Sequence, residues 1–257
     1  MLILRIKEGF STRRTEEDTL PVFRHEYKYV SPEGLLSSLE RRLSALMPLD
    51  PHTEDGQYAI RSVYFDDLYD TCFWENEDGA DPREKFRVRI YGCSKERITL
   101  ELKRKERGKC LKTSCPISLG TCEEILGCKI PRLASDQPYL LKKLISQMQF
   151  RALRPVVIVV YERVPFVWRE GNVRVTFDRN IRSSSKLDAF FDKDLPCRPA
   201  LPLGVNMMEV KFDELLPDFI AQMLETGALR QTAFSKYYLC RKFSMSQMVK
   251  PASFDTR

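Results

Sequence analysis

Histidine is scarce in this chain of 257 residues, which contains only His25 and His52. With so few imidazoles, a Ser–His–Asp or Cys–His catalytic group is not supported. The eight cysteines are scattered and none forms a Cys-x-x-Cys pair. Zinc-ribbon and thioredoxin-like sites are therefore disfavoured, and we interpret the thiols as reduced.

Long apolar runs are also missing. No stretch approaches the ~20 apolar residues of a membrane-spanning helix, and the first 20 residues lack the apolar core of a secretory signal. No internal repeat or low-complexity block occurs. The sequence predicts a cytoplasmic protein that does not itself span a membrane. We expect a loosely held arm over residues 1–20, one domain over residues 21–244 and a tail over residues 245–257.

Basic residues are in modest excess, with a net charge of +6 and a pI near 8.8. This excess suggests an anionic partner without naming it. The basic residues lie within predicted strands rather than along one helix or tail, which disfavours nucleic-acid binding.

Short runs rich in β-branched and aromatic residues dominate the chain and predict strands. They are Phe23–Val30, Tyr58–Asp66, Lys85–Tyr91, Ile98–Lys105, Leu111–Ile117, Pro155–Arg163, Val173–Asp178 and Met207–Phe212. Helical spacing of apolar residues predicts three helices, over Pro32–Met47 with Ser31 as its cap, Asp136–Gln149 and Glu214–Glu225. Many strands with few helices between them favour an antiparallel α+β or barrel architecture.

Charged residues alternate with apolar ones along these strands, and three strands repeat the pattern Glu-x-Lys: Glu26–Lys28, Glu101–Lys103 and Glu209–Lys211. Alternate residues of a strand face opposite sides, so each strand has a charged face. On an open sheet that face would simply meet water. If the sheet closes into a barrel, the cations meet in one lumen, where they repel unless a polyanion enters. Carboxylates beside phosphate call for a divalent metal, so the pattern predicts phosphate together with a metal.

Nine segments in order resemble the VTC domain, the polyphosphate polymerase domain of vacuolar transporter chaperone complexes, in the triphosphate tunnel (CYTH-like) superfamily. The segments span about residues 23 to 243. They are RHEYKY at 24–29, SVYFD at 62–66, FRVRIYG at 86–92, LELKRK at 100–105, RPV at 154–156, YER at 161–163, VRVTFD at 173–178, MEVK at 208–211 and FSKY at 234–237.

The resemblance implies a closed antiparallel eight-stranded β-barrel, a triphosphate tunnel with flanking helices. It further implies transfer of the γ-phosphate of ATP to a growing polyphosphate chain. The implied phosphate-binding residues are Lys28, Arg87, Arg89, Lys103, Lys112, Arg163, Arg174 and Lys236, of which Arg87, Arg89, Lys103 and Arg163 are the candidate catalytic residues. Lys109 is the alternative to Lys112.

Glu209 is the implied main ligand of Mn²⁺ or Mg²⁺, with Glu26 and Glu101 as further candidates. Two positions depart from the pattern of relatives. Arg24 replaces a glutamate that is common in the superfamily, which fits the VTC branch, and Ala233 replaces a lysine of the vacuolar polymerase.

Two other functions remain open at this point. A tunnel triphosphatase would activate water, with Glu26 or Glu101 as its general base. An accessory subunit would bind polyphosphate without making it. Because vacuolar polymerases push their product through a membrane channel, we also expect a separate membrane partner protein, and a pull-down that recovers none would count against it.

Overall fold

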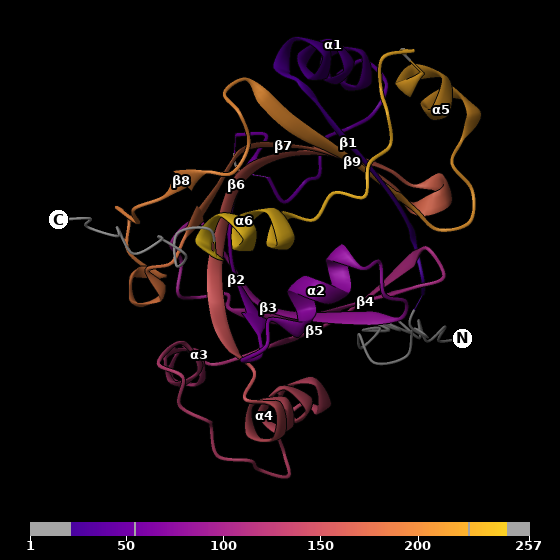
Figure 1. Ribbon diagram of the computed structural model, residues 1–257. Coiled ribbons are helices and arrows are strands. Elements are labelled where there is room, and N and C mark those ends of the chain that lie inside the picture. The colour runs from indigo at the N-terminus through magenta and orange to yellow at the C-terminus, as the bar shows by residue number, and fades with distance from the viewer. Residues whose placement is uncertain (1–21, 54, 226, 246–257) are drawn as a thin grey trace, which may run out of the picture.

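The computed structural model describes residues 22–53, 55–225 and 227–245, and its centre is one strongly curled antiparallel sheet (Figure 1). Its strands lie in the order β1-β9-β7-β6-β2-β3-β4-β5, and the short strand β8 pairs with β7. The bounds are β1 His25–Pro32, β2 Tyr58–Asp66, β3 Arg83–Tyr91, β4 Thr99–Glu106, β5 Lys109–Pro116, β6 Arg154–Trp168, β7 Val173–Ser184, β8 Arg198–Pro199 and β9 Val205–Phe212.

The curl brings the two edge strands, β1 and β5, into contact. Arg24, just before β1, and Cys110 of β5 exchange two backbone hydrogen bonds of 2.9 Å. The chain turns between β4 and β5 at Arg107 and Gly108, both with positive φ. Because β5 begins directly after this turn, β1 extends beyond the end of β5. Beyond that point β1 is bordered by Gln231 and Thr232. The predicted closed barrel is therefore approximate, because a single residue pair among the described residues, Arg24 and Cys110, joins its two edges.

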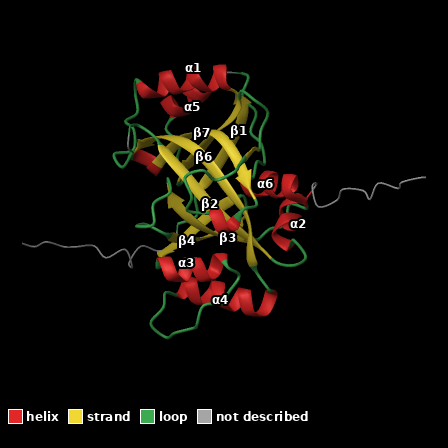
Figure 2. Ribbon diagram, turned by 90° about the vertical axis from the view of Figure 1, so that its left-hand side faces the viewer, coloured by secondary structure: helices red, strands yellow, loops and turns green. Residues whose placement is uncertain are grey.

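Helices cover the barrel on two opposite sides (Figure 2). On one side, α1 (Glu33–Ser44) and α5 (Asp218–Leu224) pack on β7 and β9, with Leu36, Leu39 and Leu43 fully buried. On the other side, α3 (Leu119–Leu126) and α4 (Tyr139–Arg151) pack on β3 and β4. A third core, which includes Val157 and Val159 of β6, packs against the helices at one end of the barrel. The outward apolar residues of the strands thus build three cores, which leaves the charged faces for the interior.

The helices α2 (Thr71–Glu77) and α6 (Lys236–Met245) lie side by side across one end of the barrel (Figures 1 and 2). The rings of Phe73 and Tyr238 stack at 4.8 Å between them. Tyr237 is buried and donates a hydrogen bond to Asp66, which ties α6 to the end of β2. Two short 3₁₀ turns, Glu170–Asn172 and Leu187–Ala189, complete the described structure.

All eight predicted strands and the three predicted helices are present, with shifted ends. The predicted cap of the first helix is wrong: Ser31 belongs to β1, and α1 begins after Pro32 without a side-chain cap. The sequence analysis missed α2, α3 and α6, which are short. Residues 1–20 of the predicted arm and 246–257 of the predicted tail lie outside the described residues, whereas Met245 ends α6.

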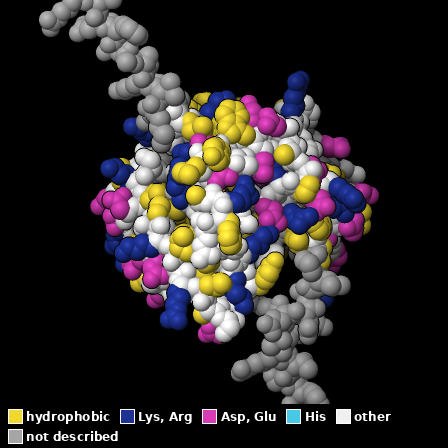
Figure 3. All heavy atoms as spheres, turned by 60° about the horizontal axis from the view of Figure 1, so that its bottom comes forward, with side chains coloured by type: hydrophobic (Ala, Val, Ile, Leu, Met, Phe, Trp, Pro, Cys, Tyr) yellow, Lys and Arg dark blue, Asp and Glu magenta, His cyan; other side chains and the backbone are white. Residues whose placement is uncertain are grey.

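In the described ranges no helix has the length and apolarity that crossing a bilayer requires. The space-filling view from the side of α3 and α4 shows basic and acidic side chains interspersed on that face (Figure 3). The dense cationic cluster of this protein lies inside the barrel.

Candidate functional site: a cationic tunnel

The barrel encloses a cavity of about 340 Å³, lined by the inward-facing alternate residues of its strands and by the start of α6. Eleven Lys and Arg side chains line it against three glutamates. The cations are Arg24, Lys28, Lys85, Arg87, Arg89, Lys103, Lys112, Arg163, Arg174, Lys211 and Lys236. A cavity with this excess of positive charge is stabilised by a bound polyanion.

The structure brings together all the phosphate-binding and metal-ligating candidates of the sequence. The eight predicted cations and Glu26, Glu101 and Glu209 line this one cavity. Lys109, the alternative to Lys112, instead forms an ion pair of 2.9 Å with the exposed Glu214. Lys112 is thus the residue that the fold places in the tunnel.

Glu101 of β4 is held by arginines of β3. Arg87 donates from Nε to Glu101 at 2.6 Å and from Nη1 to the Tyr64 hydroxyl at 2.9 Å. Arg89 lies 3.8 Å from the same carboxylate and donates to Ser62 and Tyr161. Burial alone would raise the pKa of Glu101, but Arg87 and Arg89 lower it far below its usual range. Glu101 is therefore a firmly ionised carboxylate at neutral pH.

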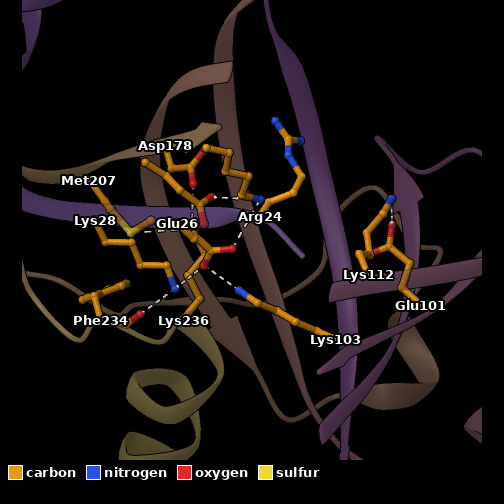
Figure 4. A network of polar contacts seen from close by, with 12 residues as sticks. Arg24, Glu26, Lys28, Glu101, Lys103, Lys112, Asp178, Met207, Phe234 and Lys236 are labelled. Atoms are coloured by element: carbon orange, nitrogen blue, oxygen red, sulfur yellow. Dashed lines mark hydrogen bonds and ion pairs between the residues drawn. The ribbon is translucent and has the colours of Figure 1, made fainter. Parts of the chain in front are cut away.

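Glu26 is the centre of a second cluster, which joins β1 to β4 and β9. Lys103 and Lys28 point toward its carboxylate, at 2.5 and 2.8 Å, as Figure 4 shows. Lys211 lies 3.7 Å from Glu26 and 3.5 Å from Glu209. Burial acts to raise the pKa of Glu26, yet the three lysines hold it well below its normal value.

Asp178 of β7 lies behind two of the tunnel cations and is fully buried. It accepts two hydrogen bonds from Arg163, at 2.6 and 2.8 Å, and forms a 2.6 Å ion pair with Lys236 of α6. Arg163 also lies 3.3 Å from Glu209. Asp178 thus fixes two cations from different elements against the same part of the tunnel wall.

Glu26 and Glu209 are the carboxylates best placed for a metal. They are neighbours on the paired strands β1 and β9. Burial and the nearby Glu26 act to raise the pKa of Glu209. Three lysines, Lys211, Lys236 and Lys28, outweigh both effects, so the pKa of Glu209 lies below its usual value. Within the described residues no three His, Cys, Asp or Glu side chains form a metal-binding group, so Glu101 does not join this pair. One or two carboxylates are enough for Mg²⁺ when phosphate oxygens supply further ligands. The donor set therefore fits a metal that arrives with phosphate.

Sequence reasoning missed four charged residues of this site. Arg24, named from the sequence only as a departure from the pattern of relatives, also lines the tunnel. Lys85 continues the alternation of Arg87 and Arg89, and Lys211 is the lysine of a Glu-x-Lys pattern, so both had a signal. Asp178 alternates with apolar residues of its strand in the same way. Its position behind Arg163 and Lys236 depends on contacts across 15 and 58 residues of sequence, which no local pattern reveals.

Lys85 has an unusual environment. It donates to Asn76 Oδ1 at 2.9 Å and lies 4.8 Å from the centre of the Tyr237 ring, and it forms no ion pair in the part of the chain that the structure describes. Burial is the main cause that lowers its pKa to about 7, with smaller contributions from the nearby Arg83, Lys103 and Lys28 and against the opposing effect of Cys72.

We therefore expect polyphosphate binding to weaken as the pH rises through 7. A bound polyanion favours the charged form of Lys85 and raises its pKa, so binding above pH 7 takes up a proton. Between pH 7 and 9 the affinity for long-chain polyphosphate should fall by more than about tenfold. Calorimetric titrations at pH 8 in buffers of different ionisation enthalpy would measure the proton uptake. The Lys85→Met variant should lose most of it, and equal uptake in both proteins would contradict the assignment.

The curled antiparallel sheet and its cationic lumen define a tunnel-fold protein that handles phosphate. The sequence profile of the VTC domain matches residues 23–245, and the chain belongs to the VTC domain family.

Several solved structures are similar to this chain, and two of them illustrate the likeness in fold. HpAC1 from Hippeastrum, described as an adenylyl cyclase candidate with a dominant triphosphatase activity, is 12% identical, with a TM-score of 0.51 over 91% of this chain and 100% of that one. An adenylate cyclase candidate from Bacillus halodurans is 14% identical, with a TM-score of 0.47 over 82% of this chain and 95% of that one. No curated protein matches the chain.

Proposed function

We propose that this protein is an ATP-dependent polyphosphate polymerase, which transfers the γ-phosphate of ATP to the end of a polyphosphate chain inside the tunnel. The observation that carries the proposal is the enclosure of eleven cations with an adjacent glutamate pair in one cavity of about 340 Å³. Phosphoryl transfer depends mostly on positioning and charge neutralisation, which such a cavity supplies.

The state of the glutamates favours a phosphate acceptor over water. A hydrolase needs a general base whose pKa lies near the working pH. The two candidates for that role, Glu26 and Glu101, have pKa values held far below this range by their lysine and arginine partners. A terminal phosphate needs no such base, because it is already an anion at neutral pH.

The tunnel residues then have separate roles in the transfer. An oxygen of the terminal chain phosphate forms a bond to the γ-phosphorus, while the bond from that phosphorus to the β–γ bridging oxygen breaks and ADP leaves with the electron pair. Arg87, Arg89 and Arg163 stabilise the charge that develops on the transferred group. Lys28, Lys103, Lys112, Arg174 and Lys236 hold the flanking phosphates in line. A divalent metal bound by Glu209 and Glu26 would neutralise phosphate oxygens.

Product analysis after incubation with ATP and Mn²⁺ tests this proposal. We expect long phosphate chains together with ADP, one phosphate residue added for each ADP formed. Glu209→Ala should reduce turnover about 100-fold or more, because it removes the main metal ligand. Glu214→Ala is the matched control, since its exposed carboxylate lies outside the tunnel and should leave turnover unchanged.

Two outcomes would overturn the polymerase assignment. Orthophosphate as the main product identifies a tunnel triphosphatase. Polyphosphate binding with turnover no higher than that of Glu209→Ala identifies an accessory binding subunit.

A further inference from the structure

A second cavity, of about 370 Å³, adjoins the tunnel at the end covered by α2 and α6. It lies between Asn76 of α2, the segment Gln231–Ser235 and the ends of β3, β4 and β5. The two cavities share Glu26, Lys28, Lys85, Lys103, Cys110 and Ser235 as lining residues. A ligand in the main cavity can therefore extend into this second compartment.

Three cations that line the second compartment, Arg83, Lys85 and Lys105, differ in their pairing from the other cations of the two cavities. Over the described ranges of the chain none of the three forms an ion pair. Each of the other ten cations of the main cavity has a carboxylate within 4.0 Å. Arg83 donates to the Ala80 carbonyl at 2.7 Å. Glu75 of α2 interacts with Arg83 and Lys85 at longer range and forms no ion pair with either.

The register of β3 and β4 places like charges opposite each other. Arg83 faces Lys105, and Lys85 faces Lys103. Like charges on directly opposed residues of a sheet destabilise the pairing. Burial and the surrounding cations also lower the pKa of Lys105, which reflects this repulsion. A bound anion would relieve it.

The two compartments therefore differ in what an anion must displace. In the main cavity a phosphate competes with Glu26, Glu101 and Asp178 for their cation partners. In the second compartment Arg83, Lys85 and Lys105, which form no ion pair within the described part of the chain, are available without such competition.

Strand β3 links the two compartments with a continuous row of cations. Arg83, Lys85, Arg87 and Arg89 occupy alternate positions, so they follow one another at intervals of roughly 6.6 Å along the strand. Arg87 and Arg89 belong to the main cavity, Lys85 lines both cavities, and Arg83 lines the second. A linear polyanion that binds along this strand passes from one compartment into the other.

We propose that the second compartment is an extension site for the internal residues of a linear inorganic polyphosphate, with Arg83, Lys85 and Lys105 as its contacts. Internal phosphates carry one negative charge each, which single unpaired cations can match without a metal. A triphosphate fills the main cavity, and the residues of a longer chain occupy the second compartment. The role of this site in polymer synthesis rests on the proposed function. Binding of polyphosphate at the site does not itself require turnover.

The test compares the affinities of two probes, tripolyphosphate and long-chain polyphosphate, for the full chain and for the double variant Arg83→Gln/Lys105→Gln. We expect the variant to bind the long chain about tenfold or more weakly, since two charge-assisted contacts are lost, and to bind tripolyphosphate within about twofold of the wild type. Lys129→Gln/Arg132→Gln, which removes two exposed cations between α3 and α4, is the matched control for net charge and should change neither affinity.

The outcomes separate this inference from the polymerase proposal. Unchanged long-chain binding, or equal weakening for both probes, overturns the extension site. Normal tripolyphosphate binding shows that the variant is folded, and its thermal unfolding temperature should equal or exceed that of the wild type because a like-charge pair is gone. If the length dependence holds while ATP yields no polymer, the extension site stands and the polymerase proposal fails.

Discussion

Replacing Arg87 by alanine is expected to reduce turnover with ATP by about 10²–10³-fold, the usual cost of removing a group that stabilises transition-state charge. Arg87 reaches the tunnel from the centre of β3 and presents its guanidinium between Glu101 and Tyr64. Lysine at this position keeps the charge but loses the planar, bidentate donor, so Arg87→Lys should fall between the alanine variant and the wild type.

The same substitution has a second expected effect, on the product. Arg87 is the main cation that lowers the pKa of Glu101. Without it, Glu101 becomes a better base, and the residual activity should shift from polyphosphate toward orthophosphate. Chromatographic separation of the two products measures this shift.

Arg104→Ala is the matched control for Arg87→Ala. Arg104 follows Lys103 on β4 but belongs to the outer face, where it pairs with Glu84 and Glu106 and its side chain is 41% exposed. Its loss should leave turnover within about twofold of the wild type, because surface ion pairs contribute little. Equal rates for the wild type and Arg87→Ala would remove the proposed active site.

Replacing Asp178 by asparagine is expected to destabilise the fold by about 3–5 kcal/mol, because it removes the ion-pair partner of the buried Lys236 and leaves Arg163 with Glu209 alone. For a domain of this size that loss corresponds to a fall of roughly 10 °C in the thermal unfolding temperature. Asp194→Asn, at an exposed position, is the control and should unfold like the wild type.

A polyanion should restore much of this loss. Tripolyphosphate supplies negative charge to the same two cations, so it should raise the unfolding temperature of Asp178→Asn by more than it raises that of the wild type. Thermal denaturation of both proteins over a series of tripolyphosphate concentrations measures the difference. A variant that is destabilised but responds to ligand no more than the wild type would show that Asp178 supports packing rather than the phosphate-binding cations.

Much of this site could be predicted from the sequence because a strand has a fixed two-residue period. Once Arg87 and Arg89 are placed on one face, Val88 must lie on the other, and the same holds for Glu101 and Leu102. The apolar faces had to be buried somewhere, and the helices found on the outside of the barrel explain why the charged faces point inward.

Which charged residues form ion pairs with one another could not be predicted in this way. Lys103 and Glu26 are 77 residues apart and meet only because the sheet curls until β1 and β4 face each other. The short helices α2 and α6 gave weak periodic signals, yet α6 delivers Lys236 to the tunnel and α2 borders the second compartment. Glu101 lines the tunnel as predicted, but it forms an ion pair with Arg87. Among the described residues it does not join Glu26 and Glu209 in a metal-binding group.

The sequence by itself determined which side chains share a face, where eight of the nine strands form and that the shared charges are mainly cationic. Tertiary structure alone decided which cations have carboxylate partners, that Asp178 anchors two of them, and that three on β3 and β4 have none among the residues that the structure describes. The reason is physical: alternation along a strand is local geometry, whereas the electrostatic state of each group depends on charges that the curled sheet brings together from distant parts of the chain.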